Sequence, residues 1–265
     1  MRSTRLASLL FIAVTCAGCF QMTTVMKLNG DGSGTVEHRM LFTTQALAQL
    51  RQFGALGGGR GGAVDPTSEQ QAREMATALG PGVTYVSSSP ITTATGQGRD
   101  AIYAFADVNL VRVATQPPAP GGASIKAQGL STHAEMVSFS LTHETNGNAV
   151  LHIKVPESAL IDALASGAAT APQQLAMIKT LLAGAHVMLG VEPAGQLVRT
   201  SSAYADGPRV TLLEVDLDQV LNDPTLIARV QAAKTPEEMK AALKDVPGLK
   251  MTLEPEITIE FTPAK

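Results

Sequence analysis

The stretch from Asn29 to His38 reads NGDGSGTVEH, and two structures are compatible with it: a calcium-binding loop or a tight turn between two strands. Asn29, Asp31 and Ser33 have the spacing of the first ligands of an EF-hand loop. An EF-hand, however, has a helix on each side of its loop, and Met40 stands where the bidentate glutamate belongs. The stretch therefore predicts a β-turn, and a calcium site is the alternative.

The segments that flank this turn have the two-residue period of β-strands. After the turn, Val36, Met40 and Phe42 fall on one face, while Glu37 and Arg39 fall on the other. The three glycines of the turn supply the positive φ that a tight connection needs without steric cost. We therefore predict that the chain opens with a hairpin that buries one face.

The residues before the hairpin are typical of an export signal. A short basic region, Arg2 and Arg5, precedes the apolar run LASLLFIAV, which is too short to span a bilayer. Two small residues directly before Cys19 look like the lipobox of a bacterial lipoprotein, in which the cysteine thiol accepts a diacylglyceryl group before cleavage. We predict a lipoprotein signal peptide over residues 1–18 and an acylated Cys19 as the first mature residue.

Two alternatives exist for this region. Cys16 and Cys19 could form a disulfide in an oxidising compartment, although Cys16 lies in the segment that is removed. An ordinary secretory signal could instead be cut near Ala17. Phe20, and not Asp, follows the anchor, and by resemblance to Gram-negative lipoproteins this favours the outer membrane, facing the periplasm. The predicted partner is thus the membrane, through acylated Cys19, and a further protein or lipid partner in the envelope is left open.

The composition is that of a globular domain without a nucleic-acid surface. The chain has 265 residues, of which 45% are hydrophobic and 4% aromatic. Removal of Arg2 and Arg5 with the signal peptide changes the formal net charge of the chain from −3 to −5. The mature chain therefore has no basic stripe for nucleic acid or anionic lipid. No second apolar run is long enough to cross a membrane.

The rest of the chain alternates helices and strands. Asn146 and Gly147 are a strong hairpin signal between two apolar strands. The predicted helices cover residues 43–53, 68–80, 158–183, 223–232 and 235–244, and the predicted strands cover residues 83–91, 100–108, 136–143, 149–155, a meander over 186–218 and a last strand over 251–261. We predict an α+β fold, with an antiparallel or mixed sheet and helices packed on one face. Residues 19–265 form the envelope domain, either undivided or in two subdomains divided near residues 115–124, which are rich in Pro and Gly.

No group of residues has the spacing of a catalytic or metal centre. The five histidines lack the HxH and HExxH spacings of zinc sites, and His38, on an apolar strand face, is typical of a hydrogen-bonded core residue. Two sets of carboxylates alternate along predicted strands, as solvated sheet surfaces do: Glu214, Asp216 and Asp218, and Glu254, Glu256 and Glu260. The sequence predicts no enzyme, no cofactor and no metal.

The order of these motifs is similar to that of known lipoproteins. A lipobox, a strand, the turn NGDGSG and a second strand are followed by GVTYVSSSPI, YAFADVN and LEPEITIEF. Over most of residues 19–262 this resembles a group of uncharacterised bacterial lipoproteins. A short stretch near the start resembles, more distantly, the LppM-type lipoprotein domain with its pattern L-N-x-D-G-S-G. The resemblance implies an α+β envelope domain and carries no catalytic residue.

Three hypotheses for the function follow. The first is a membrane-anchored envelope lipoprotein of non-enzymatic binding or scaffolding type. The second is a periplasmic carrier of a small apolar ligand or lipid, because many Ala, Leu, Val and Met side chains could line a cavity between sheet and helices. The third is a module stabilised by calcium at Asn29, Asp31 and Ser33, whose melting temperature would rise with calcium.

Overall fold

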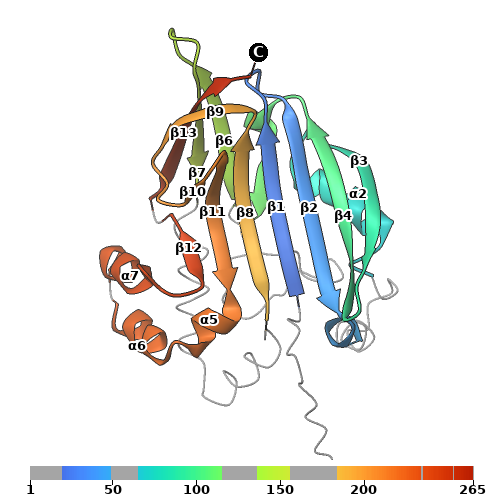
Figure 1. The fold of residues 1–265 in the computed structure, drawn as a ribbon, viewed down its shortest axis with the longest axis vertical. Coiled ribbons are helices and arrows are strands. Elements are labelled where there is room, and N and C mark those ends of the chain that lie inside the picture. The colour runs from blue at the N-terminus through green and yellow to red at the C-terminus, as the bar shows by residue number, and fades with distance from the viewer. Residues whose placement is uncertain are drawn as a thin grey trace, which may run out of the picture.

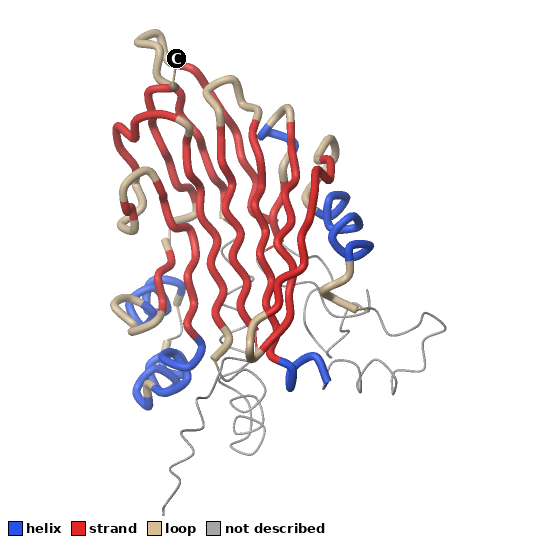
Figure 2. The backbone as a smooth tube through the Cα atoms, turned by 45° about the vertical axis from the view of Figure 1, so that its right-hand side comes forward, coloured by secondary structure: helices blue, strands red, loops and turns tan. Residues whose placement is uncertain are grey.

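Two β-sheets packed face to face make up most of the molecule (Figure 1). The computed structural model describes residues 20–48, 65–114, 136–155, 184–233, 235–252 and 254–264. The larger sheet has eight strands and the smaller one five, and helices lie at one side and at one end (Figure 2). The predicted α+β class, with a mixed or antiparallel sheet, is confirmed.

The larger sheet is mixed. Its strand order is β10-β11-β8-β1-β2-β4-β3, with β12 also paired to β11. Only β1 and β8 run parallel; the other neighbours in this sheet are antiparallel. Its strands are β1 (Phe20–Leu28), β2 (Gly34–Thr43), β3 (Thr84–Thr92), β4 (Gly96–Phe105), β8 (His186–Pro193), β10 (Ala205–Asp206), β11 (Arg209–Asp216) and β12 (Leu249–Met251).

The smaller sheet is antiparallel throughout, in the order β5-β6-β7-β13-β9. It lies against the upper half of the larger sheet as drawn in Figure 1. Its strands are β5 (Arg112–Ala114), β6 (Met136–His143), β7 (Ala149–Lys154), β9 (Gly195–Thr200) and β13 (Glu256–Pro263). Asn146 and Gly147 connect β6 to β7, with Gly147 at a φ of 87°, as the hairpin signal predicts.

One apolar core joins the two sheets. Leu28 and Val36 of the larger sheet and Ile153, Ile259 and Phe261 of the smaller sheet all have an exposed fraction of 0% and belong to the same cluster. Each side chain comes from the inward face of a strand with a two-residue period, so alternation along the sequence becomes burial between the sheets. This cluster supplies the main hydrophobic stabilisation of the fold.

The helix α2 (Glu69–Ala78) packs on β3 and β4. The side chain of Ser68 accepts a hydrogen bond from the backbone of Gln71 and so caps the first turn, and Gly80 follows the helix at a φ of 122°. Ala72 and Ala76 are buried against the sheets. The predicted helix over residues 68–80 is confirmed, and residues 44–48, also helical, are the described part of the helix predicted over 43–53.

Three short helices follow β11 and lie at the lower end of the larger sheet in Figure 1. They are α5 (Leu217–Asn222), α6 (Pro224–Ala232) and α7 (Pro236–Leu243), and a 3-10 turn, η1 (Val108–Leu110), precedes β5. Thr235 and Glu238 form a capping box at the start of α7, within the helix predicted over 235–244. A second apolar cluster, which includes Val220, Leu226 and Met239, holds these helices together.

The predicted meander is wrong, because its first two strands belong to different sheets. β8 pairs with β1 and β11, whereas β9 pairs with β13. The chain crosses between the sheets at Ala194, whose N–H donates to the carbonyl of Leu28 at 2.7 Å, and Gly195 follows with a φ of 154°. A short turn between two strands is compatible with a hairpin or with a change of sheet, and strand periodicity does not distinguish the two.

The last predicted strand is likewise two strands. Leu249–Met251 pairs with β11 in the larger sheet, and Glu256–Pro263 joins the smaller sheet between β7 and β9. Pro255 lies in the connection, where its missing N–H interrupts no ladder. Cys19 and the signal peptide, the predicted helix over 158–183 and the predicted division near 115–124 all lie outside the described residues.

Candidate functional site

The turn between β1 and β2 is a hairpin turn whose polar side chains bond to one another. Asp31 Oδ1 accepts hydrogen bonds from the N–H of Ser33 at 2.9 Å and from Ser33 Oγ at 2.7 Å. Asn29 Nδ2 donates to Ser33 Oγ at 3.0 Å, and Gly32 has a φ of 87°. Bonding to Ser33 lowers the pKa of Asp31. Strands flank the turn on both sides, so the predicted hairpin is confirmed.

This turn also joins the two sheets at the upper end of the molecule. The carbonyl of Gly30 lies 2.6 Å from His143 Nε2 at the end of β6, and the carbonyl of Gly32 accepts from the N–H of Val108 at 2.9 Å. Gly34 begins β2 where a Cβ would collide with the carbonyl oxygen of Lys27, so glycine is required by the close approach of the backbone. The β1–β2 turn thus also holds the two sheets together at this end of the molecule.

Three of the described histidines make contacts that join different segments of the fold. His143 contacts the β1–β2 turn, as above. His152 Nδ1 lies 2.7 Å from Glu256 Oε1 across β7 and β13, and His186 Nε2 lies 3.5 Å from Glu214 Oε1 across β8 and β11. His133 lies outside the described residues.

His38 differs from these because one of its ring nitrogens is buried without a partner. It lies on the inner face of β2, directly opposite Thr24 of β1, and only 7% of it is exposed. Nδ1 is 2.8 Å from Thr24 Oγ1, whereas Nε2 has no hydrogen-bond partner among the described residues. Burial lowers the pKa of His38 to about 4, so the imidazole is neutral at pH 7.

A small cavity of about 10 Å³, lined in part by His38, lies between the inner face of β2 and β4 and the helix α2. It has room for about one water molecule. Its walls are His38, Met40, Pro66, Gln71, Ala72, Met75, Arg99, Ala101 and Tyr103. None of these side chains is acidic, and two of them are thioethers.

Two other polar side chains of the cavity wall, Arg99 and Tyr103, have partners of their own. Arg99 donates from Nε to the carbonyl of Thr67 and from Nη1 to Ser88 Oγ, both at 2.7 Å. Tyr103, which is fully buried, donates its hydroxyl to the carbonyl of Ala72 at 2.9 Å, and burial raises its pKa. Among the described residues, the buried side-chain atom of this site that lacks a partner is His38 Nε2.

The pair of Thr24 and His38 also separates two apolar clusters on one face of the larger sheet. Towards the upper end lies the core shared with the smaller sheet. Towards the lower end, near the start of β1, lies a separate cluster of Met22, Met40, Phe42, Ala46 and Leu47. The pair is thus a polar interruption in an otherwise apolar surface.

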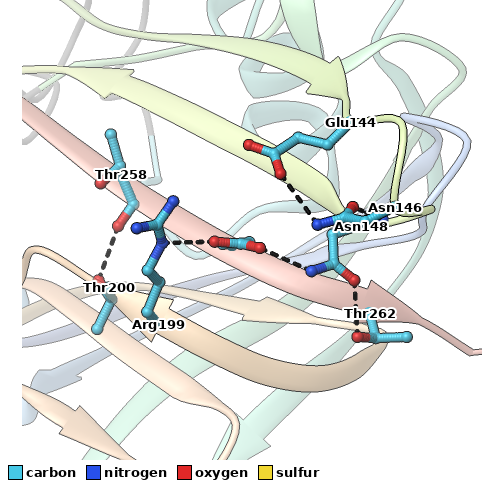
Figure 3. Close-up of polar contacts among 8 residues, drawn as sticks. Glu144, Asn146, Asn148, Arg199, Thr200, Thr258 and Thr262 are labelled. Carbon is cyan, nitrogen blue, oxygen red and sulfur yellow. Dashed lines mark hydrogen bonds and ion pairs between the residues drawn. The ribbon is translucent and has the colours of Figure 1, made fainter.

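A second buried polar group lies on the outer face of the smaller sheet (Figure 3). Glu260 of β13 is 6% exposed, accepts from Asn148 Nδ2 at 2.6 Å and forms an ion pair with Arg199 Nε of β9. Asn148 Oδ1 in turn accepts from Thr262 Oγ1 at 2.9 Å. The hydrogen bond from Asn148 and the charge of Arg199 lower the pKa of Glu260.

The predicted alternation of solvated carboxylates therefore needs two corrections. Glu254 and Glu256 are exposed as expected, but Glu260 is buried because Asn148 from the β6–β7 connection and Arg199 from β9 reach it. In the other set, Glu214 of β11 forms a cross-strand ion pair with Lys250 Nζ at 2.9 Å.

The other two members of that set, Asp216 and Asp218, form hydrogen bonds at the helix that follows β11. Asp216 ends β11 and caps α5 by accepting from the N–H of Gln219, and Asp218 lies in α5 and accepts from the N–H of Gly184 at 2.6 Å. The helix begins where the alternation was expected to continue, because the side chain of Asp216 satisfies one N–H group of its first turn, that of Gln219.

The sequence contains a signal for one of the site's contacts and none for the others. If β1 and β2 pair across the predicted turn with Gly34 opposite Leu28, then His38, four residues after Gly34, lies opposite Thr24, four residues before Leu28. Nothing local places Met75 or Arg99 beside them, because these residues arrive from α2 and β4.

No cluster of three or more His, Cys, Asp or Glu side chains suited to a metal ion occurs in the part of the chain that the structure describes. No helix within the described ranges is both long and apolar enough to cross a membrane.

Comparisons with known proteins give little further information. No family model matches the chain, and no curated protein matches it. Among solved structures, the chain is similar to the folded domain of the Mycobacterium tuberculosis LppM protein, determined by NMR. The sequence identity is 10%, the alignment covers 94% of this chain and 96% of that domain, and the TM-score is 0.34. A likeness at this level assigns neither a fold nor a function to the chain.

Proposed function

We propose that this protein is an envelope lipoprotein of non-enzymatic binding or scaffolding type, anchored in the outer membrane by acylated Cys19 and facing the periplasm. The observation that carries the proposal is the position of the lipobox. Cys19 directly precedes Phe20, the first residue of the central strand β1. The anchor and the folded domain are therefore consecutive in the chain.

This adjacency supports a fixed orientation at the membrane. Phe20 lies opposite Phe42 in the β1–β2 ladder, with their ring centroids 4.9 Å apart, so the first residue after the anchor already belongs to the sheet. The lower end of the larger sheet in Figure 1 would then face the lipid, and the β1–β2 turn and the hairpin at Asn146 would point away from it.

A binding or scaffolding role is supported by what the ionisable side chains do. The contacts of His143, His152 and His186 join strands or turns. The buried carboxylate of Glu260 joins three segments of the smaller sheet. These groups are used to hold the structure together. A carrier of apolar ligands remains the alternative, although the cavity beside His38 is too small for an acyl chain.

Intact mass spectrometry of the membrane-extracted protein tests the anchor. The expected mass corresponds to cleavage before Cys19 plus the attached acyl chains, and the matched variant Cys19→Ala should lack the added lipid and keep residues 1–18. An unmodified wild-type protein would refute the proposal. Fractionation of inner and outer membranes then decides which membrane holds it.

The orientation has a separate test with two single-cysteine variants. Ala94, in the exposed β3–β4 turn at the same end as Phe20, and Thr145, in the exposed β6–β7 turn at the opposite end, are each replaced by cysteine and labelled with a fluorophore. Lipid-borne quenchers in vesicles should quench the label at position 94 and leave that at 145 bright. Equal quenching, or quenching at 145 only, would refute the orientation.

A further inference from the structure

The cavity beside His38 combines features of a soft-metal site. We propose that it binds one monovalent soft metal ion, Cu⁺ or Ag⁺, through His38 Nε2 and the thioether sulfurs of Met40 and Met75. The inference does not depend on the acylation of Cys19.

The imidazole has the arrangement expected of a metal ligand. Metal-binding histidines usually donate the other ring N–H to a hydrogen-bond acceptor, which fixes the tautomer and the orientation of the ring. Here Nδ1 lies 2.8 Å from Thr24 Oγ1, and with the proton on Nδ1 the lone pair of Nε2 is free. Nε2 is buried and has no partner among the described residues. A buried nitrogen without a partner costs free energy, and a bound metal ion would remove that cost.

Two thioethers line the same cavity from different elements. Met40 follows His38 by two residues on the same face of β2, and Met75 comes from α2 on the other side. Thioether sulfur and imidazole together favour Cu⁺ over hard cations, which prefer oxygen ligands. Met75 is half-buried, so its side chain connects the cavity with the surface of α2.

The charge of the cavity wall selects a monovalent ion. Among the described residues, the wall has no carboxylate to neutralise a divalent ion, and the guanidinium of Arg99 belongs to it. Arg99 is held by Thr67 and Ser88, so its positive charge stays beside the cavity. Both facts raise the free-energy cost of binding a divalent ion more than that of binding a monovalent ion. The competing occupant is one ordered water bonded to Nε2.

Titration with Ag⁺, which undergoes no redox change under these conditions, tests the site on the purified protein against a competing chelator. Cys16 and Cys19 are first replaced by alanine, since a free thiolate would bind Ag⁺ itself, and this parent protein, called wild type below, should bind one Ag⁺ tightly. Met75→Leu keeps the shape of a half-buried side chain but removes its sulfur, so binding should weaken roughly tenfold or more. Met188→Leu is the matched control, because Met188 is also half-buried but lies on β8 away from the cavity, and its loss should leave this binding unchanged.

Nitrogen NMR of the histidine rings identifies the ligand directly. Ag⁺ should shift the Nε2 resonance of His38 in the wild type and in Met188→Leu. Absence of tight Ag⁺ binding, equal weakening by the two methionine variants, or an unshifted His38 Nε2 with the metal bound would each overturn the proposal and leave an ordered water as the occupant.

Discussion

Two buried polar groups, His38 in the larger sheet and Glu260 in the smaller one, are both more than nine-tenths inaccessible, but they are satisfied differently. Each oxygen of the Glu260 carboxylate has a partner, Asn148 for one and Arg199 for the other. The imidazole of His38 has a partner at Nδ1 only. Glu260 stays charged, whereas His38 stays neutral because burial lowers its pKa to about 4.

The difference separates a structural contact from a candidate site. A buried group with all its partners holds neighbouring segments together, as Glu260 of β13 does for the β6–β7 connection and β9. A buried group that lacks one partner costs free energy unless water or a ligand completes it. Substitutions at these two groups and at an exposed ion pair distinguish the two cases.

Thr24→Val should have the largest effect on stability. It removes the one described partner of His38, so both ring nitrogens become unsatisfied, and we expect a loss of about 2–3 kcal/mol in the free energy of unfolding. Denaturant unfolding at pH 7.5 measures it. The double variant Thr24→Val/His38→Leu replaces both partners by apolar groups and should recover much of the loss. A single variant as stable as the wild type would mean that the pair is not a buried hydrogen bond.

Mild acid should destabilise the protein through His38. Above pH 6.5 the imidazole is neutral in both states, so His38 contributes no pH dependence. Below pH 6.5 the unfolded chain takes up a proton that the folded protein binds only near pH 4, so stability falls as the pH falls. Between pH 8 and pH 5 the expected loss is about 2 kcal/mol. His38→Gln should flatten the profile in this window, and an equally steep profile in that variant would assign the effect to other groups.

Arg199→Ala should have a smaller effect, in a different pH window. It removes one of the two partners of Glu260, so the melting temperature at neutral pH should fall by less than in Thr24→Val, and the pKa of Glu260 should rise. Because the folded pKa is lowered, the contribution of Glu260 is present above its ordinary carboxyl pKa and is lost as the pH falls through the folded value. The carboxyl carbon NMR signal of Glu260 follows the titration, and an unchanged titration would show that Asn148 alone holds the charge.

Lys27→Ala should have the smallest effect. Lys27 Nζ lies 2.6 Å from Glu37 Oε1, but both side chains are nearly half exposed on the outer face of the larger sheet. Water and salt screen such a pair, so we expect a change within about 0.5 kcal/mol. Thermal unfolding at low and high salt is the measurement. A loss as large as that of Thr24→Val would remove the distinction between buried and exposed partners.

Much of the local structure follows from the sequence. The turn at Asp31 and Gly32 and the hairpin at Asn146 and Gly147 form where the sequence predicts them, because backbone conformation there depends on the residues themselves. The capping box of Thr235 is likewise a local device. The position of the His38–Thr24 pair follows from the hairpin register alone.

The tertiary structure decided which sheet each strand joins and what surrounds His38. Strands of both sheets have the same two-residue period, so the sequence does not reveal that β8 and β9 separate at Ala194 or that β12 and β13 separate near Pro255. The same holds for the burial of Glu260 and for the meeting of His38, Met40 and Met75 at one cavity. Hydrogen bonds and packing between residues far apart in the chain set these features, and no local pattern encodes them.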